Sequence, residues 1–125
     1  MTQVQMADGD LNLKLAELMG WKSGGDPNKK RDFVWWIDEN RFRLPEKWNP
    51  CTDHTASLEV QAAAIAKDKH GYLNNLAGII TEVYPRDLNW DIVWTNDEII
   101  SFITATPRQR AEAAYMTLKE VQRHE

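Results

Sequence analysis

The segment that decides the fold is TATPRQRAEAAY, residues 104–115, because it joins a helix start to an inward-facing stripe. Thr106 can cap the helix, and Pro107 suits its first turn, where no backbone N–H partner is needed. At 100° per residue, small and apolar side chains then share one face. They are Ala111, Ala114, Tyr115, Leu118, Val121 and Gln122. The sequence therefore predicts a C-terminal helix packed along one face.

Two arginines stand at this helix start, Arg108 near one edge of the stripe and Arg110 near the other. A cation in a first helical turn costs roughly 0.3–1 kcal/mol at low salt. Glu112, four residues after Arg108, can offset that cost, as can Asp97 or Glu98. The arginine stems can also cover the edge of the core. Alternatively, free amides and guanidinium groups together hold a bound anion, or the arginines contact a partner.

At the N-terminus, residues 1–9 are expected to form a flexible polar arm. Asp10 can cap a helix over 11–19. Gly20 then suits the left-handed position after the helix, and Trp21 folds back onto it. The inward face carries Leu11, Leu15 and Leu18.

A hairpin is expected after this helix. Residues 22–31 contain two glycines, a proline and four cations and are predicted to be a mobile loop. Residues 32–37 are aromatic and β-branched, which is typical of a strand. Residues 41–44 can return as a second strand, which Pro45 ends.

The middle of the chain predicts two further helices. Thr52 or Asp53 caps the first, over 57–69, and Gly71 ends it. Residues 72–83 have helical spacing, although a strand through the β-branched GIITEV is the alternative.

Between this region and the C-terminal helix, residues 90–94 alternate as a short strand does. Thr95 and Glu98 form a capping-box pattern, so 95–104 is a short helix or a hairpin strand. The whole predicts one α+β domain over 1–125, in which a small antiparallel sheet packs with N-terminal, central and C-terminal helices.

Composition excludes several function classes. The chain has 125 residues, a formal net charge of −4 and a single cysteine, Cys51. It lacks the clustered cations that long nucleic acids require, although a small anionic ligand remains compatible. It also lacks an apolar run of membrane-spanning length and a signal-peptide core. One cysteine allows no intrachain disulfide, which fits a cytoplasmic protein.

The residues with catalytic chemistry form weak patterns. Cys51 and His54 lie three residues apart around Asp53, which is too few ligands for a strong zinc prediction. A nucleophilic Cys51–His pair has no supporting context, and His70 is expected to meet helix carbonyls. No phosphate-binding or nucleophile-elbow motif is present. We therefore expect neither an enzyme nor a cofactor or metal.

Six tryptophans are many for this length. Most are expected to fill the core, and one or two can be exposed for stacking or for a subunit contact. This surplus favours a homodimer or higher oligomer. The six are Trp21, Trp35, Trp36, Trp48, Trp90 and Trp94.

Three stretches in order, LNLKLAELMGW, WNPCTDHTASLEVQ and ATPRQRAEAAYMTL, resemble the phage ABA-sandwich domain family. The shared features are Gly20-Trp21, Trp48-Asn49-Pro50 followed by Thr52-Asp53, and Ala105-Thr106-Pro107. The resemblance implies an α+β fold, a phage or prophage origin and no established enzymology. Similar proteins include Thoeris anti-defence sponges, which sequester cyclic nucleotide signals at subunit interfaces with arginines and aromatic side chains.

The leading hypothesis is thus a non-enzymatic phage protein that sequesters a cyclic nucleotide immune signal in the host cytosol. Its candidate ligand-binding residues are Arg108, Arg110, Thr106, Tyr115 and Trp94. The alternatives are an inhibitor that binds a host defence protein in the manner of an anti-CRISPR, and a structural phage domain. Such an inhibitor would use acidic side chains, namely Asp38, Glu39, Asp97 and Glu98.

Overall fold

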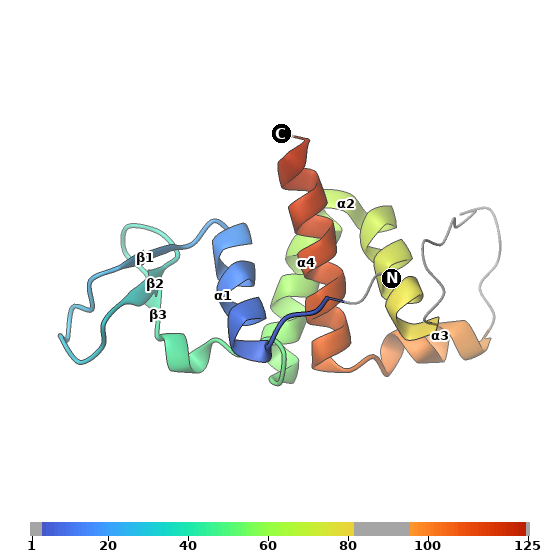
Figure 1. The fold of residues 1–125 in the computed structure, drawn as a ribbon, viewed down its shortest axis with the longest axis horizontal. Helices are drawn as coiled ribbons and strands as arrows, with labels where there is room; N and C mark the ends of the chain where they lie inside the picture. The colour runs from blue at the N-terminus through green and yellow to red at the C-terminus, as the bar shows by residue number, and fades with distance from the viewer. Residues whose placement is uncertain (1–3, 82–95, 125) are drawn as a thin grey trace.

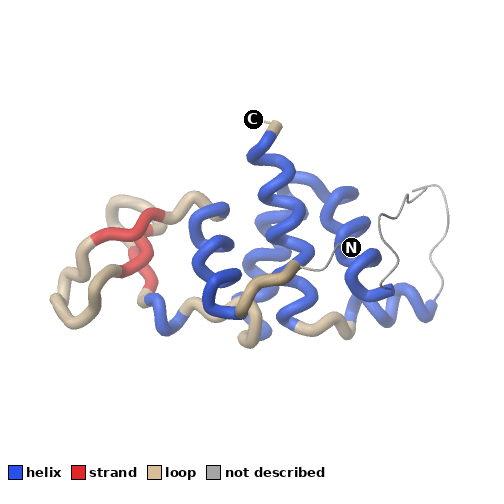
Figure 2. Tube along the Cα trace, viewed as in Figure 1, coloured by secondary structure: helices blue, strands red, loops and turns tan. Residues whose placement is uncertain are grey.

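A computed structural model describes residues 4–81 and 96–124 and shows the expected α+β fold, which is mostly helical (Figure 1). The sheet lies at one end of an elongated molecule and α3 at the other (Figure 2). In chain order the elements are α1 (Asp8–Leu18), β1 (Lys22–Gly24), β2 (Val34–Trp36), β3 (Phe42–Arg43), a 3₁₀ turn η1 (Pro45–Lys47), α2 (His54–Thr81), α3 (Asn96–Ile103) and α4 (Pro107–Arg123).

The helical core forms where α4 packs between α1 and α2 (Figure 1). The facing positions are mostly small, which lets the helices approach closely, and leucines fill the remaining space. This confirms the stripe predicted for α4, apart from Gln122, which is exposed. The buried residues include Leu11, Leu15 and Ala16 of α1, Val60 and Ala64 of α2, and Ala111, Ala114 and Leu118 of α4.

The end of α1 has the geometry that the sequence predicted. Gly20 adopts a left-handed φ of 86°, and its amide donates to Glu17 O, while the Trp21 amide donates to Ala16 O at 3.1 Å. This pair of bonds satisfies carbonyls that the helix would otherwise leave free. The start differs, because the helix begins at Asp8 and Asp10 lies in its first turn instead of capping it.

The three strands form one antiparallel sheet in the order β1-β2-β3. Lys22 pairs with Trp36 across β1 and β2, and Trp36 pairs with Phe42 across β2 and β3. The predicted strands over 32–37 and 41–44 are therefore confirmed with shorter bounds. The third strand, β1, falls in the segment that was expected to be loop throughout.

An aromatic cluster joins the sheet to the helices. Trp21, Trp35 and Trp48 are all less than 10% exposed, and the Trp21 and Trp48 ring centroids lie 4.4 Å apart. The Arg43 guanidinium stacks within 5.3 Å of both ring centroids and donates to both oxygens of the Glu59 carboxylate. Three of the six tryptophans, Trp21, Trp35 and Trp48, are thus core fillers, as the sequence predicted.

The segment predicted as a mobile loop is organised around one buried carboxylate. Asp26 accepts backbone N–H bonds from Asn28, Lys30 and Arg31, at 2.8 to 3.0 Å. These bonds, with the nearby Arg31 guanidinium, hold the pKa of Asp26 below its usual value against the opposing effect of burial. The loop therefore has a defined internal structure.

The long helix α2 consists of two legs that meet at a break (Figure 1). Asp68 has extended backbone angles there, and its carboxylate accepts the Gly71 amide at 3.0 Å. It therefore caps the second leg, as an N-cap aspartate does. The sequence had suggested that Gly71 ends the first helix, but Gly71 lies in the first turn of the second leg. A Cβ at Gly71 would instead collide with the Asp68 carboxylate.

The two ambiguous segments are helical where the structure describes them. Residues 72–81 complete α2, and α3 occupies most of 95–104. Asp53 caps α2, since its carboxylate accepts the Ala56 amide at 3.2 Å. The strand predicted over 90–94 and the Thr95 half of the capping box lie outside the described residues.

Candidate functional site

Arg108 is neutralised from within the molecule. Its Nε donates to Glu112 at 2.6 Å, and its Nη1 donates to Asp8 at 2.8 Å. Its Nη2 donates to the backbone carbonyls of Val4 and Met6 at 3.1 and 2.6 Å. All three guanidinium nitrogens are therefore engaged. Glu112 is a partner that the sequence suggested, whereas the second carboxylate comes from Asp8, which the sequence did not suggest. Partial burial lowers the pKa of Arg108, but the bonds to Glu112 and Asp8 outweigh it and raise the pKa.

These bonds also hold the N-terminal arm. Val4 and Met6 belong to the segment 1–9 that was expected to be flexible. Their carbonyls nevertheless accept hydrogen bonds from Arg108 of α4. Residues 8 and 9 are already part of α1. The described part of the arm is therefore attached to the helical core.

Arg110, which the sequence places near the edge of the stripe, is buried, with 4% of its surface exposed. Its Nη1 lies 3.0 Å from His54 Nδ1 and 3.3 Å from Ser57 Oγ, and its Nη2 donates to Ile103 O at 3.3 Å. Because His54 Nδ1 must accept, the proton of a neutral His54 ring lies on Nε2. Within the described residues every partner of Arg110 is neutral. Arg110 thus joins α2, α3 and α4, and its burial keeps it from an external anion.

The remaining predicted ligand-binding residues have different fates. Thr106 caps α4, because its hydroxyl accepts the Gln109 amide and the Gln109 side chain accepts the Thr106 amide. Trp94 lies outside the described residues. Tyr115 is half-buried and lines a surface groove. Tyr115 is therefore a predicted residue that the structure places beside a cavity.

The groove that Tyr115 lines runs between α1 and α4 and has a volume of about 300 Å³. Lys119 Nζ lies 5.4 Å from the centroid of the Tyr115 ring, within the range of a cation–π contact. Lys14 and Glu17 face it from α1, so two cations and one anion line the groove. Leu18 and Gln122 complete the lining.

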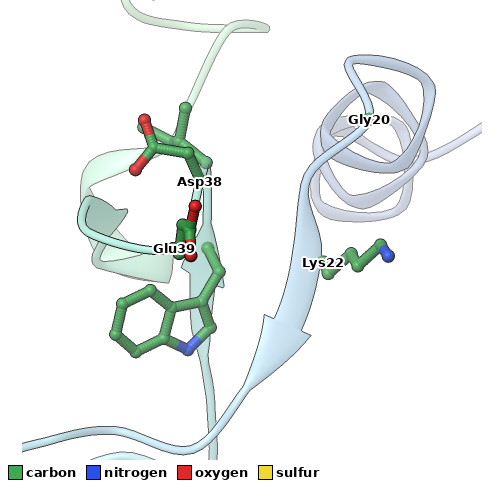
Figure 3. Close-up of a pocket in the computed structure, with 6 residues that line it drawn as sticks. Gly20, Lys22, Asp38 and Glu39 are labelled. Atoms are coloured by element: carbon green, nitrogen blue, oxygen red, sulfur yellow. The ribbon is translucent and has the colours of Figure 1, made fainter.

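A second cavity, of about 430 Å³, lies where the end of α1 meets the sheet (Figure 3). Asp38 and Glu39 line it from the turn after β2, and Lys22 lines it from β1. In Figure 3 the Lys22 side chain is directed away from the two carboxylates. Gly20, Trp36 and Ile37 complete the lining.

Cys51 is a buried thiol without a catalytic partner among the described residues. It is 4% exposed, and its Sγ lies 3.6 Å from Asp8 O and 3.9 Å from Arg108 Nη1. His54, the residue that could activate it, is bonded to Arg110 instead. Burial raises the pKa of Cys51 to about 11, although Arg108 works against this rise. The side chain is thus a protonated core group at neutral pH.

Cys51 is expected to react with iodoacetamide at pH 8 roughly 100-fold more slowly in the folded chain than in urea, because two pKa units reduce the thiolate fraction by that factor. The rate should rise as pH approaches 11. Since the folded pKa exceeds the unfolded one, this group's contribution to stability is complete below pH 9 and is lost as pH rises towards 11. Alkylation followed by mass spectrometry tests this, and equal rates in the two states would contradict the burial.

Comparison with known proteins identified no similar protein. No family model, no curated protein and no solved structure matches this chain. Within residues 4–81 and 96–124, no group of three metal-ligating side chains could hold a metal ion. No helix in the described part of the chain is both long and apolar enough to cross a bilayer.

Sequence reasoning did not anticipate Lys14 and Lys119 beside Tyr115. Both lie on predicted helices, and Lys119 follows Tyr115 by four residues, which places the two side chains on one face. That spacing was a usable signal. The approach of Lys14 was not visible, because it depends on how α1 docks against α4.

Proposed function

We propose that this chain acts by binding, and that the groove between α1 and α4 accepts a small phosphate-bearing ring such as a nucleotide. The observation that supports this proposal is the position of Tyr115 with Lys119 above its ring and Lys14 across the groove. An aromatic face stacks on a base, and ammonium groups pair with phosphate. Arg108 and Arg110 have no part in this site, because their partners are internal.

The charge of the groove favours an anion. Lys14 and Lys119 are both exposed, and neither takes part in an ion pair among the described residues. Glu17 is the one acidic side chain in the lining. The local balance is therefore positive, on a chain whose formal net charge is −4, and such a local field attracts phosphate over short distances.

The size of the groove limits the ligand. A volume of about 300 Å³ lies at the lower end of the range for small-molecule sites, about 300–1,000 Å³. It accommodates one nucleotide, or one half of a cyclic dinucleotide whose other half contacts a second copy. The resemblance to phage ABA-sandwich proteins suggests the biological role, which is to sequester a host immune signal without converting it.

The test is a thermal-shift and calorimetric screen of the full chain against cyclic mono-, di- and trinucleotides and cyclic ADP-ribose isomers. We expect a ligand that raises the melting temperature and is recovered intact after heat denaturation. Tyr115→Leu is expected to weaken its binding about tenfold, from lost stacking. Lys119→Ala is expected to weaken it about fivefold. Native mass spectrometry of the same samples reports whether a homodimer carries the ligand.

The matched control is Lys22→Ala, which removes an exposed lysine from the other cavity and should leave the affinity unchanged. If no nucleotide binds, or if Lys22→Ala weakens binding as much as Lys119→Ala, the groove is not the site. Recovery of a hydrolysed ligand would contradict the non-enzymatic part of the proposal.

A second candidate function, inhibition of a host protein, is supported by α3. Three isoleucines on this short helix, Ile99, Ile100 and Ile103, are 43%, 55% and 68% exposed, beside the exposed Asp97. Such a patch is typical of protein-binding surfaces. Ile100→Glu should abolish co-purification of a host partner without lowering the melting temperature, whereas Ile65→Glu, at a half-buried position of α2, should lower it.

A further inference from the structure

The cavity between the end of α1 and the sheet differs in chemistry from the groove proposed above. Its lining is mainly apolar, and the Trp36 and Ile37 side chains provide the apolar part. Trp36 is held in place from two sides. Its ring centroid lies 5.1 Å from that of Phe42, and a Cβ at Gly24 would come within 2.8 Å of two indole atoms. The indole is therefore a fixed aromatic wall.

The charged groups of the lining are the carboxylates of Asp38 and Glu39 and the ammonium group of Lys22. Asp38 is paired with Arg41, so Glu39 carries the negative charge that no described cation neutralises. The Asp38 carboxylate accepts the backbone amides of Asn40 and Arg41 and the Arg41 Nε. These bonds hold the pKa of Asp38 below its usual value, so it stays ionised and fixed in the turn. Glu39 is exposed and its carboxylate makes no hydrogen bond or ion pair with the described residues, which leaves it available.

The helix end adds a negative partial charge. Gly20 lines the cavity immediately after α1, whose last turn carries no basic residue. The C-terminus of a helix favours cations for this reason. Lys22 is the one positive side chain in the lining, and it is directed away from Asp38 and Glu39 (Figure 3).

We infer that this cavity binds an organic cation, an alkylammonium or alkylguanidinium group, with its charge against Glu39 and the face of Trp36 and its alkyl stem over Ile37. An aromatic face with a neighbouring carboxylate is the arrangement that recognises such cations. The same chemistry belongs to a free polyamine and to a lysine or arginine side chain of another protein. This site is independent of the nucleotide groove.

The test follows the tryptophan indole N–H signals of the uniformly ¹⁵N-labelled full chain during titration. The probes are n-butylguanidinium, n-butylammonium and the uncharged n-butanol. We expect the Trp36 signal to shift saturably with both cations and at least fivefold more weakly with n-butanol. Glu39→Gln is expected to weaken cation binding about three- to fivefold, and Lys22→Gln to tighten it about twofold. An equal response to n-butanol, or no effect of Glu39→Gln, would overturn the inference.

Two further arms identify the source of the cation. Spermidine represents a free polyamine, and the peptide acetyl-Gly-Arg-Gly-amide represents a protein side chain. Glu39-dependent binding of either supports the inference, and the tighter of the two names the source, whereas binding of neither contradicts it. Glu17→Gln, in the groove between α1 and α4, is the matched control and should leave these affinities unchanged. Nucleotide binding is measured separately, so failure of one site does not imply failure of the other.

Discussion

Trp48→Ala is expected to lower the free energy of unfolding by about 3–5 kcal/mol, the range for truncating a large buried aromatic side chain. Trp48 is 2% exposed, and its indole N–H donates to Asn12 O at 2.9 Å. The substitution opens a cavity beside Trp21, removes one ring from beneath Arg43 and removes the bond that the indole donates to Asn12 O. Urea denaturation, followed by far-ultraviolet circular dichroism, measures the loss.

Two companion variants separate the causes. Trp48→Phe keeps most of the packing and removes the hydrogen bond, so it should cost about 1–2 kcal/mol. Trp36→Ala removes a tryptophan that is half-exposed and should cost about 1 kcal/mol. Equal costs for Trp48→Ala and Trp36→Ala would show that the aromatic cluster does not hold the sheet to the helices.

Arg110→Ala is the second substitution with a large expected effect, a loss of about 2–4 kcal/mol. It removes the bonds to His54, Ser57 and Ile103 and leaves a cavity where α2, α3 and α4 meet. The effect is on stability and not on recognition. The melting temperature should therefore fall equally with and without a nucleotide ligand.

Arg110→Met is the informative comparison. Arg110 has no anionic partner among residues 4–81 and 96–124. A buried cation of this kind bears an uncompensated cost of dehydration, and replacing it by an apolar side chain of similar length is often nearly neutral. We expect Arg110→Met to retain at least half of the stability that Arg110→Ala loses. If either variant abolished nucleotide binding at unchanged stability, Arg110 would have to be restored to the ligand site.

The sequence predicted those features that depend on neighbouring residues. Gly20 and Trp21 terminate α1 through bonds within five residues, and Thr106 with Gln109 caps α4 in the same local way. The sequence also allowed Asp68 to be predicted as an N-cap. The helix boundary was predicted at Gly71 instead, because glycine is the commoner signal for a helix end. The strand β1 was not predicted, because the glycines and the proline of residues 22–31 are typical of a loop.

Features that depend on docking could not be predicted. A helical wheel places Arg110 beside the apolar stripe, but its burial requires His54 and Ser57, which arrive from a helix more than 50 residues earlier. Asp8 is 100 residues from Arg108. The sequence identified Arg108 and Arg110 as unusual and offered Glu112 as a partner of Arg108, which the structure confirms, but it did not predict the burial of Arg110. Tyr115, another of the candidates, lies beside a groove at the surface.

The position of the sheet at one extremity of the molecule affects how the protein can change over time. Its hairpin turn and the segment around Asp26 project beyond the helices (Figure 2). Substitutions there alter the outer surface, while the alanine-lined contacts of α2 with α4 remain as they are. Descendants of this chain can therefore acquire new specificities at the tip of the molecule and inherit an unaltered helical scaffold.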